Sequence, residues 1–169
     1  MKHWLWLSFA VLALDQVSKW MVLLTLSPFE TVALIPNVNL TLMFNKGAAF
    51  SFLATAGGWQ RWLLAGLALV VTGVLTVWLA RLKPEERLQA SALALLIGGA
   101  LGNLIDRVLF GHVVDFIQVY LPVIPLDLFN PWPAFNIADS AITIGVLILL
   151  ITTLTADGNR APPSSGTSA

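Results

Sequence analysis

Residues 111–140 read GHVVDFIQVYLPVIPLDLFNPWPAFNIADS, and the path of the chain across a membrane depends on this stretch. It is a Pro-rich connection between two very apolar segments, with Asp115 near its beginning and Asp139 near its end. If those segments cross a membrane in succession, the connection lies on one face, so both aspartates share that side. A carboxylate at the boundary between hydrocarbon and water costs free energy, so it is expected to be paired with another group or to have a function. Asp115 and Asp139 are therefore candidates for a pair that shares a proton and activates water.

The composition of the whole chain sets the class of protein. Hydrophobic residues make up 57% of the 169 residues and charged residues only 11%, and the mean hydropathy is +0.83. These values are typical of an integral membrane protein. Nine Lys and Arg balance nine Asp and Glu, so no nucleic-acid partner is expected. The absence of cysteine excludes disulfides, thiolate metal sites and a cysteine nucleophile.

Four apolar runs are long enough to cross a membrane as helices, at about residues 4–26, 62–80, 88–110 and 137–156. The first follows Lys2 as a signal peptide would. It is too long for one, however, and it contains Asp15 and Lys19 with no Ala-x-Ala site after it, so we interpret it as a span. We find no repeat and predict one domain at 1–156. The Pro-, Ser- and Gly-rich tail at 157–169 is expected to be disordered.

The connection between the first two spans contains a strand pattern. Polar and apolar residues alternate in NVNLTL at 37–42, a period of two that is typical of a half-buried strand on the membrane surface. The strand leads to Asn45, Lys46 and Gly47, which form either a hairpin turn or a loop that a substrate backbone approaches closely. The expected fold is an all-α membrane protein with four transmembrane helices and a small β-rich extracytoplasmic element between helices 1 and 2.

Polar and small residues inside the spans allow more than one interpretation. Asp15 and Lys19 are four residues apart on one helix face, so they form either a structural ion pair or part of a pocket. The segment GGALG at 98–102 provides a small-xxx-small face for close helix packing. Asp106 with Arg107 favours a charge cluster that caps the end of the third span at the membrane interface.

Asp139 has a structural interpretation beside the catalytic one. Asn136 is a plausible N-cap of the fourth span, and Asp139, three residues later, would favour the positive end of the helix dipole. The two interpretations are compatible, because capping would also fix the carboxylate in place.

The distribution of Lys and Arg predicts the orientation. Five lie on one side of the predicted membrane and three on the other, namely Lys2, Arg81, Lys83, Arg87 and Arg160 against Lys46, Arg61 and Arg107. The positive-inside rule then puts both termini and the tail in the cytoplasm. Asp115 and Asp139 are accordingly expected near the outer face.

Other chemistries fit the residues less well. A zinc site needs three protein ligands, but the histidines are His3 and His112, and there is no H-E-x-x-H motif, so no metal or cofactor is expected. Ser18 is next to Lys19, but neighbours on a helix point in different directions, which weakens a Ser–Lys mechanism. The alternative from another class is a small non-enzymatic transporter or assembly factor with structural aspartates.

Five motifs in order along the chain resemble those of signal peptidase II, the bacterial lipoprotein signal peptidase family. They are DQVSK at 15–19, NKGAAF at 45–50, GGALGNLIDR at 98–107, VVDF at 113–116 and FNIADS at 135–140. The resemblance implies an aspartyl endopeptidase of the bacterial inner membrane. Its substrates would be prolipoproteins whose cysteine carries diacylglyceryl, so membrane lipid is a second expected partner, and no oligomer is implied.

The resemblance also implies roles for individual residues. Asp115 of VVDF and Asp139 of FNIADS would be the catalytic pair. Cleavage would fall on the N-terminal side of the lipidated cysteine, with water activated between the two aspartates. The site would be shaped or supported by Asp15, Lys19, Asn45, Gly47, Gly98, Gly99, Asn103, Asp106, Arg107 and Asn136.

Overall fold

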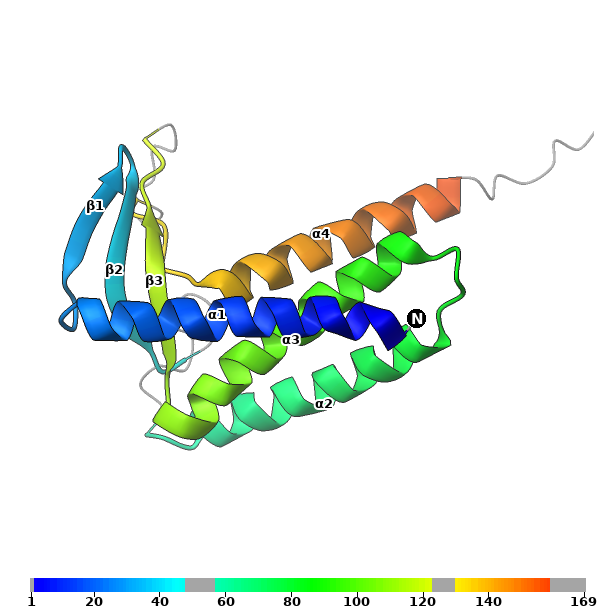
Figure 1. Ribbon diagram of the computed structural model, residues 1–169, viewed down its shortest axis with the longest axis horizontal. Helices are drawn as coiled ribbons and strands as arrows, with labels where there is room; N and C mark the ends of the chain where they lie inside the picture. The colour runs from blue at the N-terminus through cyan, green and yellow to red at the C-terminus, as the bar shows by residue number, and fades with distance from the viewer. Residues whose placement is uncertain (1, 48–56, 123–129, 159–169) are drawn as a thin grey trace, which may run out of the picture.

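The computed structural model describes residues 2–47, 57–122 and 130–158. There, four long helices form a bundle and three strands form a sheet at one end of it (Figure 1). In chain order the elements are η1 (Lys2–Trp4), α1 (Leu5–Thr25), β1 (Thr31–Ile35), β2 (Val38–Asn45), α2 (Gln60–Arg81), α3 (Arg87–Phe110), β3 (Val113–Val119) and α4 (Ile137–Gly158).

All four helices are long and apolar enough to cross a membrane, which confirms the prediction of a four-helix membrane protein. The N-terminus and the far end of α4 both lie at the end of the bundle away from the sheet (Figure 1). Of the predicted tail at 157–169, residues 157 and 158 belong to α4 and the rest lies outside the described residues. Residues 48–50 of the NKGAAF motif and residues 123–129 of the connection before α4 also lie outside them.

Helix α3 is the centre of the bundle and packs against α1, α2 and α4. Small residues allow this close packing. A Cβ added to Gly98 would lie 2.6 Å from the Ser8 carbonyl oxygen of α1, and one added to Gly99 would lie 2.5 Å from the Ala138 carbonyl oxygen of α4. The small residues predicted for close packing in this span therefore allow two helices, α1 and α4, to approach α3.

Helix α2 packs along a single stripe. Its buried residues Ala65, Thr72 and Leu79 recur every seven positions and face α3, while most of its large apolar side chains are exposed. In a membrane these exposed side chains face lipid.

The sheet is antiparallel in the order β1-β2-β3. Strands β1 and β2 come from the connection between α1 and α2, where a strand was expected. The third strand, β3, comes from the connection between α3 and α4, so the sheet does not belong to one connection alone. Val22 of α1 packs with Leu42, Val114 and Phe116 of the sheet in one apolar cluster, which fixes the sheet on the end of the bundle.

Gly111 determines where β3 begins. It ends α3 in the left-handed conformation, with φ of 80°, and its N–H donates to the Arg107 carbonyl oxygen at 3.1 Å. Glycine adopts this conformation at little cost. The chain then turns beside β2 in a register that pairs Asn45 with Val113 and Met43 with Asp115. The register brings Asp115 to the end of the helix bundle.

Candidate active site

A cavity of about 780 Å³ lies where the sheet meets α3 and α4. Its polar wall contains Asn45, Asn103, Arg107, Asp115 and Asp139. Apolar side chains complete it, among them Met43, Phe44, Val113, Phe135, Ile142 and Ile144. Strand β3 and helix α4 therefore bring the two predicted catalytic aspartates to one cavity.

Asp115 is held by two amide side chains and is only 3% exposed. Asn45 Nδ2 donates to its Oδ2 at 3.1 Å, and Asn136 Nδ2 donates to its Oδ1 at 2.8 Å. Burial, and next the negative charge of Asp139, raise the pKa of Asp115 to about 7, against the opposing effects of the two amide hydrogen bonds and of Lys19. This carboxyl group can therefore hold a proton near neutral pH.

Asp139 lies in the first turn of α4 and is fixed by a cap. Its N–H donates to Asn136 Oδ1 at 2.9 Å, while the Asn136 N–H donates back to Asp139 Oδ2 at 3.3 Å. This reciprocal pair has the form of a capping box, and it confirms Asn136 as the predicted N-cap. Asn103 Nδ2 donates to Asp139 Oδ1 at 2.7 Å, so two donors also reach this carboxylate.

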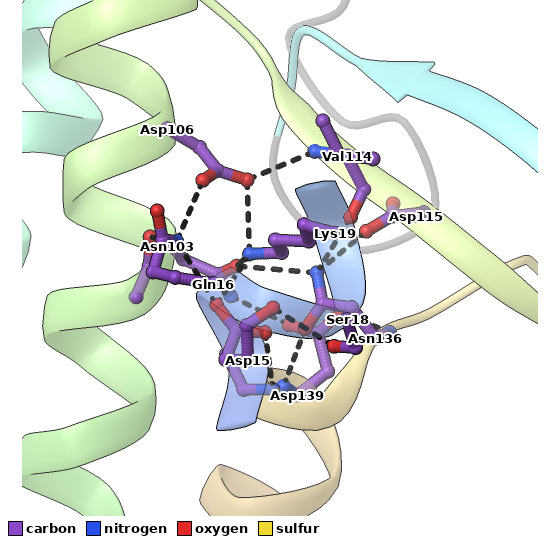
Figure 2. Close-up of polar contacts among 12 residues, drawn as sticks. Asp15, Gln16, Ser18, Lys19, Asn103, Asp106, Val114, Asp115, Asn136 and Asp139 are labelled. Atoms are coloured by element: carbon purple, nitrogen blue, oxygen red, sulfur yellow. Dashed lines mark hydrogen bonds and ion pairs between the residues drawn. The ribbon is translucent and has the colours of Figure 1, made fainter. Parts of the chain in front are cut away.

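Asn136 links the two aspartates. It is fully buried, it donates to the Asp115 carboxylate, and its own oxygen accepts the Asp139 N–H (Figure 2). The same amide nitrogen lies 3.2 Å from Asn103 Oδ1 and 3.2 Å from the Val114 carbonyl oxygen. One side chain thus couples the positions of β3, α3 and the start of α4.

Arg107 places a positive charge on the cavity wall and ties the chain after β2 to α3. Its Nη2 donates to the Gly47 carbonyl oxygen at 3.0 Å, and its Nη1 donates to the Asn103 carbonyl oxygen at 3.2 Å. The Gly47 N–H donates in turn to Asn45 Oδ1 at 3.0 Å. These bonds direct the amide group of Asn45 so that its nitrogen faces Asp115.

Asp15, Lys19 and Asp106 form a buried ion cluster that does not line the cavity. Asp106 is fully buried and contacts Lys19 Nζ at 2.9 Å. The expectation that Asp106 caps the end of α3 at the interface is therefore wrong, because its side chain points into the bundle. Ser18 donates to the Asp15 carbonyl oxygen, which leaves its hydroxyl in a backbone hydrogen bond rather than paired with Lys19.

Gly98 and Gly99 lie at helix crossings, outside the cavity wall. Gly99 packs against Ala138, the residue before Asp139, so it sets how closely α4 approaches α3. In this way Gly99 acts on the site through helix packing rather than through contact with a ligand.

Two further residues contribute here: Gln16, which the sequence did not single out, and Gly102, which the sequence placed only on the small-residue face for helix packing. Gln16 Nε2 reaches Asp15 Oδ2 at 3.2 Å and Asp106 Oδ1 at 3.0 Å. Gly102 leaves room for Asp15, whose Oδ2 would collide with any added Cβ. Adjacent helix residues point apart, so the position of Gln16 beside Asp15 gave no sign of a shared partner. In residues 2–47, 57–122 and 130–158, no three His, Asp or Glu side chains are grouped to hold a metal ion.

Comparison with known proteins shows the family to which the chain belongs. The family described as Signal peptidase (SPase) II matches residues 7–155. The chain belongs to the signal peptidase II family. It is 53% identical to the lipoprotein signal peptidase of Pseudomonas paraeruginosa (strain DSM 24068 / PA7) over 151 residues, which cover 88% of this chain and 85% of that protein. The lipoprotein signal peptidase of Pseudomonas aeruginosa (strain UCBPP-PA14) is 52% identical with the same coverage.

A solved structure has the same fold. It is titled "Bacterial membrane enzyme structure by the in meso method at 2.3 A resolution", and it is 31% identical with a TM-score of 0.83 over 97% of this chain and 94% of the other. This signal peptidase II is accordingly a peptidase and a multi-pass protein of the bacterial inner membrane. The family's aspartic type agrees with the two carboxylates on the cavity wall.

Proposed function

We propose that this chain cleaves the signal peptide from diacylglyceryl-modified prolipoproteins on the N-terminal side of the lipidated cysteine, with water activated between Asp115 and Asp139. Family membership supports the reaction. The observation that carries the assignment of residues is that one cavity receives both carboxylates, each held by amide donors.

In the proposed reaction Asp115 is the acid and Asp139 the base. Asp139, ionised, takes a proton from water as the oxygen of that water forms a bond to the scissile carbonyl carbon. Asp115, protonated, donates to the carbonyl oxygen and stabilises the charge that develops there. The pKa of about 7 for Asp115 fits the acid role, because such a group can hold a proton near neutral pH.

The second half of the reaction reverses the proton transfers. Asp139 returns its proton to the amide nitrogen as the C–N bond breaks, and Asp115 recovers its proton from the hydroxyl oxygen. The products are a carboxylate on the signal peptide and a free amine on the lipidated cysteine. No covalent intermediate with the protein is required.

The cavity also suits a substrate that keeps its acyl chains in the bilayer. Its wall is apolar where Ile142 and Ile144 of α4 face it, and α4 exposes Leu147, Leu150 and Ile151 farther along the helix. The substrate's lipid would remain beside α4 while its peptide bond meets the aspartates.

The proposal has a defined topology. Both termini lie in the cytoplasm, and the sheet and the cavity lie near the outer, periplasmic face, as the excess of Lys and Arg at the opposite end of the bundle favours. We infer one peptidase domain at residues 1–156 and assign residues 157–169 to the cytoplasmic side.

The test is cleavage of a diacylglyceryl-modified prolipoprotein by the purified wild type, Asp115→Asn and Asp139→Asn. We expect both variants to lose activity about 1,000-fold or more, because an amide cannot exchange the proton. The cap is the Asn136 oxygen, which accepts the backbone N–H of residue 139, and Asn at 139 keeps an oxygen that can accept the Asn136 N–H, so Asp139→Asn should keep the cap and the fold. Thermal unfolding in detergent checks folding, and Glu85→Gln, an exposed residue between α2 and α3, is the control. Substantial activity in either folded variant would return that aspartate to a structural role.

A further inference from the structure

In the buried ion cluster of Asp15, Lys19 and Asp106, the ammonium group of the lysine has three partners, one for each of its protons. Lys19 Nζ lies 2.8 Å from Asp15 Oδ2 and 2.9 Å from Asp106 Oδ2, and it donates to Asn103 Oδ1 at 3.1 Å. The side chains of Asp15 and Lys19 are 0% and 2% exposed. An ammonium group has three protons, so no donor of this lysine is left for substrate.

Each carboxylate of the cluster also accepts a backbone N–H immediately before a proposed catalytic aspartate. The Val114 N–H, next to Asp115, donates to Asp106 Oδ2 at 3.0 Å. The Ala138 N–H, next to Asp139, donates to Asp15 Oδ1 at 2.9 Å. The backbones of β3 and α4 are therefore both attached to the same ion cluster (Figure 2).

Gln16 connects the two carboxylates a second time. Its Nε2 lies within hydrogen-bond distance of Asp15 Oδ2 and of Asp106 Oδ1, at 3.2 and 3.0 Å. Asp15 and Asp106 thus have the same set of donors: the lysine, the glutamine and one backbone amide.

A role in stability alone explains this arrangement poorly. Buried ion pairs often contribute little net stability compared with apolar packing, because both charges lose their hydration. Their directional bonds do, however, define geometry. Here those bonds run from Val114 through Asp106, Lys19 and Asp15 to Ala138, behind the cavity.

We propose that Asp15, Lys19 and Asp106 are positioning residues that set the separation of Asp115 and Asp139 by holding the backbone amides before them. This inference rests on the proposed function. The cluster touches neither water nor substrate in the reaction. It acts on the chemical step, because two carboxylates that must share a water lose rate steeply when they are displaced by about 1 Å.

The sharpest test compares Asp106→Asn with Asp106→Leu. The two side chains are similar in size and both lack the charge, but Asn keeps an oxygen that can accept the Val114 N–H. We expect kcat to fall about 100-fold or more in Asp106→Leu and about 10-fold or less in Asp106→Asn, with KM within about threefold of wild type in both. Measurements use purified protein in detergent and the lipidated substrate, with activity corrected for the folded fraction.

A role in folding alone would give the two Asp106 variants equal kcat once only folded protein is counted, and that result would overturn the inference. Should Asp106→Leu fail to fold, the test uses Gln16→Met instead. This change removes the side chain that links Asp15 to Asp106 a second time and leaves all three charges of the cluster in place. We expect a several-fold lower kcat with unchanged KM in Gln16→Met, and wild-type kcat there would also overturn the inference. Lys83→Met, an exposed lysine between α2 and α3, is the matched control.

Failure of this inference differs from failure of the proposed function. If Asp115→Asn and Asp139→Asn are inactive while the Asp106 and Gln16 variants keep wild-type kcat, the catalytic pair is supported and the ion cluster has no positioning role. If Asp115→Asn or Asp139→Asn is active, the proposed pair itself is wrong.

Discussion

Asp115 shows how a single side chain is prepared for chemistry by its surroundings. Removal from water disfavours its ionised form, and Asp139 adds a second negative charge nearby, so the pKa of Asp115 rises to about 7. Asn45 and Asn136 oppose this rise, because hydrogen bonds to a carboxylate favour the charged form. The balance leaves the group able to hold and release a proton near neutral pH, which is what an acid catalyst needs.

This balance predicts the pH dependence of cleavage. As the pH rises through about 7, Asp115 loses the proton that the proposed mechanism requires. We therefore expect kcat/KM to fall above about pH 7, approaching tenfold per pH unit. Asn45→Ala removes a bond that favours the ionised form, so its alkaline limb should move to higher pH. Cleavage assays from about pH 5 to 9 measure both.

An alkaline limb that stays flat to about pH 9 in the wild type would contradict the assignment of Asp115 as the acid. A limb that moves to lower pH in Asn45→Ala would contradict the direction given for the hydrogen bond. Lys83→Met, far from the cavity, should leave the profile unchanged and serves as the control.

At the scale of elements, helix contacts depend on particular glycines. Gly99 allows α4 to approach α3, since an added Cβ would lie 2.5 Å from the Ala138 carbonyl oxygen and 2.8 Å from Ile142 Cγ1. Gly66 and Gly73 of α2, in contrast, have no neighbouring atom within 4 Å of an added Cβ. Glycine is thus required at one crossing and replaceable on the open face of α2.

This difference predicts opposite effects of the same substitution. Gly99→Ala should destabilise the protein by about 1–3 kcal/mol, because the collision is with backbone that cannot move aside easily. Gly73→Ala should be neutral or stabilising by up to about 1 kcal/mol, because alanine favours a helix and nothing obstructs its methyl group. Thermal and denaturant unfolding in detergent give both values. Equal destabilisation by the two changes would mean that α3 and α4 do not cross this closely.

Elements differed in how well the sequence predicted them. The four helices followed from apolar length, because a chain in lipid must satisfy its backbone hydrogen bonds within each helix. Strand β2 followed from its alternation. Strand β3 was not predicted, because its partner β2 lies about 70 residues earlier and local pattern does not report such a distant pairing.

At the scale of the whole molecule, the bundle has two chemically different ends. One end carries the sheet and the beginning of α4, and the other carries the N-terminus and the connection between α2 and α3 (Figure 1). The lining residues of the cavity place it at the end with the sheet. Helices α1 to α4 alternate in direction. The orientation of the whole bundle in the membrane therefore fixes the side on which the cavity lies.

That choice can be tested directly because the native chain has no cysteine. Ser27→Cys, exposed beside the sheet, should react with a membrane-impermeant maleimide added to spheroplasts. Lys83→Cys, exposed at the opposite end, should react only after the membrane is permeabilised. The reverse pattern would place the active site at the cytoplasmic face. Wild-type protein, which offers no thiol, is the control for labelling.

The sequence by itself determined the four membrane spans, the shared side of Asp115 and Asp139, and Asn136 as a helix cap. Each follows from local composition, chain connectivity or the geometry of one helix turn. Tertiary structure alone decided that Asp106 points inward, that Gln16 joins it to Asp15, and that β3 completes the sheet. These contacts join segments from 70 to 90 residues apart, and their energies depend on packing and burial that no local pattern encodes.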